Sequence, residues 1–204
     1  MALNPEEINK GLRHLRRADP VMRTLIRRAG PYKLKPRRDR FHALVSSIIS
    51  QQISGSAARS IRQRLHDHVA PEKLSAENLS RLAPEMLRKL GVSPQKASYL
   101  VDLANRVVSG ELRLERMGRL TDEEVIEELI KIKGIGVWTA QMFLMFSLGR
   151  LDVFPHDDLG VRTAIKNLYS LEELPDKKTS HEIAQPWRPY ASIASWYCWR
   201  SLEL

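Results

Sequence analysis

The chain has 204 residues, of which 43% are hydrophobic and 28% charged, and its formal net charge is +9. This composition can bury a core and stay soluble, either as one domain or as two small lobes. The single cysteine, Cys198, excludes an intrachain disulfide, a four-cysteine iron–sulfur cluster and a cysteine-rich zinc site. No apolar run approaches the roughly 18 residues of a membrane span, and residues 1–10 lack a secretory signal. We therefore expect an intracellular protein with no membrane partner.

Positive charge is concentrated at the N-terminal end of the sequence. Residues 1–40 contain twelve Lys and Arg against four Asp and Glu, a net charge of +8, whereas all later residues together carry +1. A basic segment of this kind suits an acidic polymer such as nucleic acid. The alternative is a solvated helix face.

Helix signals dominate the chain, and no segment alternates with period two. Asp19 is the predicted N-cap, and Pro20 the first residue, of a helix that reaches about Arg28. Asp39 can cap the next helix, whose apolar residues form one stripe: Phe41, Leu44, Val45, Ile48 and Ile49. Further helices are predicted over 56–68 and from 94 to about 110. The predicted fold class is all-α.

A glycine hairpin at residues 129–140, with the sequence LIKIKGIGVWTA, is the most informative segment. Thr121 begins a capping box for the helix that precedes the glycine turn, and a second apolar helix follows the turn. Gly134 and Gly136 let the backbone turn sharply and approach a partner closely. The start of the second helix, with Lys133 beside it, suits a phosphate group. An ordinary tight turn between helices is the alternative.

This pattern resembles the helix-hairpin-helix element of base-excision DNA glycosylases, a family in which a catalytic aspartate follows the second helix. The segment 151–162, LDVFPHDDLGVR, stands at that place. The segments IISQQIS at 48–54 and PWRPYA at 186–191, which leads to Trp196, add to the resemblance. Together these matches indicate the helix-hairpin-helix glycosylase superfamily, and within it the 3-methyladenine DNA glycosylase II branch.

The resemblance implies that Asp158 is the catalytic residue, because the second of the two acidic positions is catalytic in the family. Asp157 is then a cap or a supporting residue, and N-capping of helix 159–169 is the alternative role for either acid. A carboxylate near C1′ would stabilise the oxocarbenium-like charge of the transition state. Bifunctional members carry a Schiff-base lysine where this chain has Trp138, which implies a monofunctional enzyme without AP lyase activity.

The resemblance also places Trp138, Met142 and Trp196 in the base pocket, where aromatic faces would favour a cationic alkylated purine. Core packing is the simpler role for Trp187 and Trp199. Gln52 matches the wedge residue that fills the gap left by a flipped base, although a polar helix end is the alternative. The expected DNA-binding residues are Lys133, Gly134, Ile135, Gly136, Thr139, Gln52, Gln51 and Ser54.

By resemblance, the fold is two helical lobes with a cleft between them. Residues 42–150 would form a helical barrel that carries the hairpin, and residues 1–41 with 151–204 a second lobe that carries Asp158. No catalytic metal or cofactor is expected, apart from a possible structural Na⁺ or K⁺ at the hairpin carbonyls of Ile130, Ile132 and Ile135.

The expected function is hydrolytic excision of 3-methyladenine- or 7-methylguanine-type bases from double-stranded DNA, by base flipping, in base excision repair. We expect a monomer in the cytoplasm or nucleoid of a prokaryote, or in the nucleus of a eukaryote. Two alternatives stay open: a glycosylase for uracil, an oxidised base or a mismatched base, and a non-catalytic helix-hairpin-helix DNA-binding module.

Overall fold

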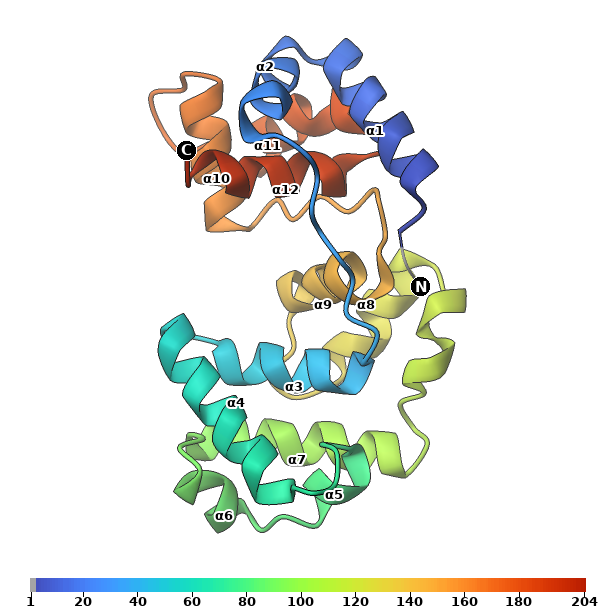
Figure 1. Ribbon diagram of the computed structural model, residues 1–204, viewed down its shortest axis with the longest axis vertical. Coiled ribbons are helices and arrows are strands. Elements are labelled where there is room, and N and C mark those ends of the chain that lie inside the picture. The colour runs from blue at the N-terminus through green and yellow to red at the C-terminus, as the bar shows by residue number, and fades with distance from the viewer. Residues whose placement is uncertain (1–2) are drawn as a thin grey trace. The chain divides into compact units, whose positions relative to one another are not determined.

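A computed structural model describes residues 3–204 (Figure 1); Met1 and Ala2, which begin the expected N-terminal lobe, lie outside the described residues. Within residues 3–204 every regular element is helical, as the sequence predicted, and there is no β-strand. Over the same range, none of the helices is both long and apolar enough to cross a membrane.

The chain divides into two compact units. Unit 1 consists of the residues up to Pro36 together with Leu144–Leu204, and unit 2 is Arg37–Phe143. The sequence-based boundaries, after residues 41 and 150, lie five and seven residues further along the chain. Two contacts explain why the boundaries in the structure come earlier in the chain than those expected from the sequence. The Arg40 guanidinium donates to the Leu114 carbonyl inside unit 2, and the Phe146 ring lies 5.7 Å, between centroids, from the Trp199 ring inside unit 1.

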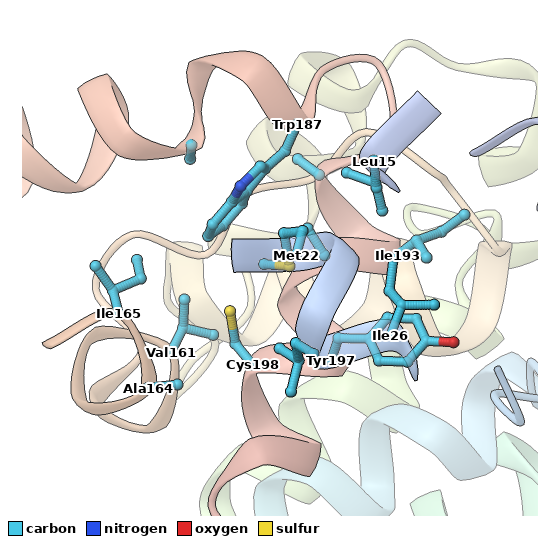
Figure 2. Packing of buried hydrophobic residues seen from close by; sticks show 14 residues of the cluster. Leu15, Met22, Ile26, Val161, Ala164, Ile165, Trp187, Ile193, Tyr197 and Cys198 are labelled. Atoms are coloured by element: carbon cyan, nitrogen blue, oxygen red, sulfur yellow. The ribbon is translucent and has the colours of Figure 1, made fainter. Parts of the chain in front are cut away.

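Unit 1 is built from helices of both chain ends. They are α1 (Pro5–Ala18), α2 (Pro20–Ala29), the π-helical turn η2 (Leu144–Leu148), α10 (Leu159–Leu168), α11 (Lys177–Ala184), η3 (Gln185–Trp187) and α12 (Ala191–Ser201). Figure 2 shows the shared core, in which side chains of α1, α2, α10 and α12 meet: Leu15, Met22, Ile26, Val161, Ile165, Tyr197 and Cys198. Each of these residues is at most 2% exposed, and burial of one such large apolar side chain contributes about 1.5–3 kcal/mol.

Asp19 ties three parts of unit 1 together. Its Oδ1 accepts the backbone N–H groups of Val21 and Met22, which makes it the N-cap of α2, as predicted. Its Oδ2 accepts the Trp187 indole N–H at 2.9 Å and the Tyr169 hydroxyl. The carboxylate is only 5% exposed, so these four donors replace the water that it has lost. Trp187 is fully buried, which confirms its expected role in core packing.

Unit 2 carries the hairpin on a set of shorter helices. They are α3 (Arg40–Ser50), α4 (Gly55–Val69), α5 (Ala76–Ser80), α6 (Pro84–Lys89), α7 (Pro94–Val108), η1 (Leu114–Arg119), α8 (Asp122–Ile130) and α9 (Val137–Phe143). Helix α7 packs against α3, α5 and α6, and α8 packs against α9. The predicted capping box is present: Thr121 and Glu124 each accept the other's backbone N–H. Asp39 caps α3, as expected.

Candidate active site and nucleic-acid interface

The hairpin between α8 and α9 is fixed by its contact with α7. Gly134 has φ +80°, and a Cβ at this position would lie 2.0 Å from Cδ2 of Tyr99. Both the backbone conformation and the close approach therefore require glycine here. Gly136 differs, because a Cβ there would meet nothing within 4 Å. The hairpin thus presents an open surface at Gly136 while its other face is anchored.

The remaining hairpin residues divide into buried and exposed ones. Ile135 is 5% exposed, and its N–H donates to the Ile132 carbonyl at 3.1 Å, so its side chain belongs to the core. Lys133 is exposed, and its backbone N–H donates to Asp102 of α7 at 3.0 Å. The lysine is therefore held by its backbone while its ammonium group faces solvent, where it can reach an anion.

A depression of about 510 Å³ lies in unit 2 between the hairpin, α7 and the α3–α4 loop. It brings together six residues that the sequence placed at the site: Gln51, Gln52, Gly134, Gly136, Trp138 and Thr139. Trp138 is 43% exposed, whereas Thr139, which also lines the depression, is 4% exposed. The depression therefore joins two segments that are more than eighty residues apart in sequence.

The α3–α4 loop holds Gln52 in a strained conformation. Gln52 has φ +54°, a region that residues other than glycine rarely adopt, and its side chain is exposed. Gln51 beside it donates from Nε2 to the Gly134 carbonyl at 2.7 Å, which links the loop to the hairpin. Ser54 is the N-cap of α4 and accepts the Ala57 N–H, so its hydroxyl already has a local structural role. Strain of this kind is concentrated at functional positions in proteins.

Lys96 of α7 supports the same loop and was not identified from the sequence. Its Nζ donates to the Ile49 carbonyl at 2.8 Å and to the Gln51 carbonyl, next to the end of α3. Burial lowers the pKa of this lysine from its ordinary value. A lysine near the start of a helix carries no local signal of such a contact, so only the tertiary structure shows it.

Asp158 is a buried N-cap in unit 1. It is 8% exposed, and its Oδ1 accepts the Val161 N–H at 2.8 Å, which makes it the N-cap of α10. The suggestion that Asp157 provides the cap is wrong. The Asp157 carboxylate is largely exposed and pairs with His156 at 3.1 Å, because the first acid lies one residue too early for the helix N-terminus.

Trp199 of α12 is a second donor to the same carboxylate. It packs against the core of unit 1, as expected, but its indole N–H also donates to Asp158 Oδ1 at 2.8 Å. Gly160 leaves room for this contact, since a Cβ there would lie 3.0 Å from Trp199 Cδ1 and 3.1 Å from Asp158 Oδ1. The sequence indicated only a packing role for Trp199, because no local pattern points to a bond with Asp158.

The loop before Asp158 is held by histidines. The His156 and His181 rings lie 4.9 Å apart between centroids, and the Asp158 N–H donates to the Pro155 carbonyl at 3.0 Å. Burial lowers the pKa of His156, and the nearby Asp157 opposes that effect. The two histidine rings therefore pack beside the loop that leads to Asp158.

The expected base-pocket residues belong to both units. Trp196 lies in an aromatic cluster of unit 1, in edge contact with Tyr32 and Tyr197 at centroid distances of 4.9 Å. Trp138 and the half-buried Met142 belong to unit 2. That they line one pocket together with Asp158 stays a prediction.

These features define a helical protein of the helix-hairpin-helix class with a carboxylate fixed at the start of a helix. The family model described as the HhH-GPD superfamily base excision DNA repair protein matches residues 45–189. The chain therefore belongs to the HhH-GPD superfamily, which confirms the resemblance identified in the sequence.

Individual relatives support this assignment. The YfjP protein of Bacillus subtilis is 36% identical over 169 residues, which are 80% of this chain and 59% of that protein. DNA-3-methyladenine glycosylase 1 of Schizosaccharomyces pombe is 32% identical over 196 residues, 94% of this chain and 86% of that protein. A solved structure of the S. pombe 3-methyladenine DNA glycosylase Mag1 with abasic DNA superposes with a TM-score of 0.85 and 32% identity, covering 96% of this chain and 97% of that one.

Proposed function

We propose that this chain is a monofunctional DNA glycosylase that excises alkylated bases, of the 3-methyladenine and 7-methylguanine type, from double-stranded DNA in base excision repair. The observation that carries the proposal is Asp158, a buried carboxylate whose Oδ1 is held by two N–H donors. The family and the names of the S. pombe relatives support the same activity.

The fixed carboxylate suits the chemistry of glycosidic bond hydrolysis. As the C1′–N bond breaks, its electron pair leaves with the base and positive charge develops on the sugar. A carboxylate already held in place stabilises that charge without reorganisation at the moment of reaction. Water then adds to C1′ and loses a proton. An alkylated purine is cationic before the bond breaks, so it leaves without a dedicated general acid.

The proposed DNA contacts use the two anchored segments of unit 2. Gln52 is the wedge, since its strained backbone presents an exposed polar side chain beside the depression. The hairpin binds the phosphate backbone through the start of α9 and the Lys133 ammonium group. The carbonyls of Ile130, Ile132 and Ile135 would hold a Na⁺ or K⁺ ion at the hairpin. A carbonyl oxygen has two lone pairs, so Ile132 can accept the Ile135 N–H and still coordinate a cation.

The proposed pocket uses aromatic faces. Trp138 and Trp196 would contact the flipped base, with Met142 as a flexible apolar wall. A tryptophan at position 138 has no amine to attack C1′, so the product is a free base and an intact abasic strand. We expect the protein to act as a monomer, which light scattering with and without a short duplex would test.

The test is base release from duplex DNA treated with dimethyl sulfate. Wild type should release 3-methyladenine or 7-methylguanine, and strand breaks should arise only after alkali. Asp158→Asn should lower the single-turnover rate about 10²–10³-fold. The matched control is Asp157→Asn, which removes the neighbouring exposed charge and should leave the rate unchanged.

Other outcomes would point to the alternatives. Release of uracil or an oxidised base, with no methylated base, would replace the proposed substrate class. Tight DNA binding without release of any base would favour a non-catalytic module. An equal loss of excision rate in Asp158→Asn and Asp157→Asn would mean that Asp158 has no special role.

A further inference from the structure

Helix α1 carries a row of cations that the proposed active site does not use. Lys10, Arg13 and Arg17 are spaced three and four residues apart, so they lie on one face of the helix, with His14 between them. Of the three cations, only Lys10 has an acidic partner among the described residues: its Nζ lies 2.6 Å from Glu7. Both arginines are exposed. The row therefore has positive charge available for a ligand.

The row lines a groove of about 580 Å³ whose other wall is Pro189 and Tyr190. The wall is fixed to α1 at two places. His14 Nε2 lies 2.9 Å from the Pro186 carbonyl oxygen, and Gly11 is so close to Tyr190 that a Cβ would lie 2.7 Å from its ring. Leu15, on the next turn, is fully buried in the core of unit 1. The groove is thus a preformed feature of the unit.

The geometry of the row matches a regular polyanion. From Lys10 to Arg17 the helix rises about 10 Å, at 1.5 Å per residue. One strand of duplex DNA carries a phosphate for about every 3.4 Å along the axis, so the row spans about three phosphates. Arg13 and Arg17, which have no acidic partner among the described residues, repel each other, and a row of phosphates would relieve that repulsion.

We infer that the α1 groove binds the phosphate backbone of duplex DNA independently of any lesion, as a contact surface additional to the hairpin. The inference extends the proposed function, on which it rests for the choice of DNA as the polyanion. The groove is separate from the proposed catalytic carboxylate, because residues of α1 with Pro189 and Tyr190 line it, whereas Asp158 begins α10. Figure 1 shows α1 and α10 on different sides of unit 1.

Such a surface would hold the protein on undamaged DNA. Phosphate contacts carry no sequence information, and they supply the non-specific affinity that keeps a protein near the duplex while it searches. Three of the twelve Lys and Arg residues in 1–40 would then act through a defined groove.

The test compares two triple variants that each lower the net charge by three. The groove variant is Lys10→Gln with Arg13→Gln and Arg17→Gln. The matched control, with exposed cations of the same unit outside the groove, is Arg27→Gln with Arg28→Gln and Lys33→Gln. Binding to an undamaged 30-base-pair duplex is measured by fluorescence anisotropy from about 50 to 300 mM salt, with circular dichroism melts to verify folding.

We expect the slope of log Kd against log salt to fall by about 2.7 in the groove variant, at about 0.9 per lost phosphate contact, and by less than about 1 in the control. Equal changes of the slope in both variants would mean that net charge alone matters. An unchanged slope in the groove variant would mean that this face of α1 is only solvated and does not contact DNA. Either result overturns the inference. Binding of polyglutamate that the groove variant loses, with an unchanged DNA slope, would overturn it in favour of an acidic protein partner. Because the duplex is undamaged, these slopes test the groove whether or not the protein excises bases.

Discussion

Replacement of Trp199 by phenylalanine separates positioning of the proposed catalytic carboxylate from packing. The indole N–H donates to Asp158 Oδ1 at 2.8 Å, and the ring lies 5.7 Å from Phe146. Phenylalanine keeps an aromatic ring at this place but has no N–H. The variant therefore removes one N–H donor to Oδ1 and leaves the Val161 N–H donor in place.

The size of the effect follows from the charge and burial of the acceptor. A hydrogen bond to a charged group contributes about 1.5–3 kcal/mol, and the carboxylate is 8% exposed, so little water can replace the lost donor. If the bond fixes the carboxylate for the transition state, this free energy is added to the barrier. Each 1.4 kcal/mol is a factor of ten, so the excision rate should fall about 10–100-fold. That loss is smaller than the one expected for Asp158→Asn.

The assay is single-turnover release of methylated bases, combined with the Kd for undamaged duplex and a thermal melt. We expect a slower rate, an unchanged Kd and a shift of the Tm by only a few degrees. Trp199→His, which keeps a ring N–H, should recover part of the rate. A Trp199→Phe variant with the wild-type rate and a lowered Tm would show that the indole only packs, and would refute this argument.

Two further predictions concern the hairpin and the loop before Asp158. Gly134→Ala should destabilise unit 2 by about 2–5 kcal/mol in urea unfolding, because a Cβ meets the Tyr99 ring at 2.0 Å and φ is +80°. Gly136→Ala should fold normally but bind DNA more weakly, so equal stability of the two variants would contradict the geometry. Burial lowers the pKa of His156, so the unfolded chain takes up this proton at a higher pH than the folded one. The contribution of His156 to the free energy of unfolding is complete above about pH 6.5 and is lost as the pH falls through the folded-state pKa. His156→Asn should therefore show a weaker loss of stability between pH 7.5 and 5.5, and an undiminished loss would count against this assignment.

The helix starts could be predicted because capping is local. Asp19, Asp39 and Thr121 each accept a backbone N–H two or three residues ahead, and those partners are fixed as soon as the helix begins. The hairpin was visible for the same reason, since both of its glycines lie within one short segment. Helix α1 was not among the predicted helices, although its N-cap, Asn4, is equally local.

The supports of the site could not be predicted because they are contacts between distant segments. Lys96 reaches the Ile49 carbonyl across 47 residues, and Trp199 reaches Asp158 across 41. Such pairs form only when the packing of whole helices brings them together, and neither partner carries a local pattern that names the other. The positive φ of Gln52, next to the anchored Gln51, likewise has no local signal in the sequence.

The two roles considered for Asp158, helix cap and catalyst, are not alternatives in the structure. The cap bond to Val161 is what turns the carboxylate and holds its Oδ1, and the start of a helix favours a negatively charged side chain. An aspartate that lost its cap would also lose its orientation, so the cap would prepare the carboxylate for the proposed chemical role. The two can still be measured separately, because asparagine caps a helix about as well as aspartate does. Asp158→Asn should therefore keep the α10 cap and the melting temperature while it loses excision, whereas Asp158→Ala should lose excision together with about 0.5–2 kcal/mol of stability.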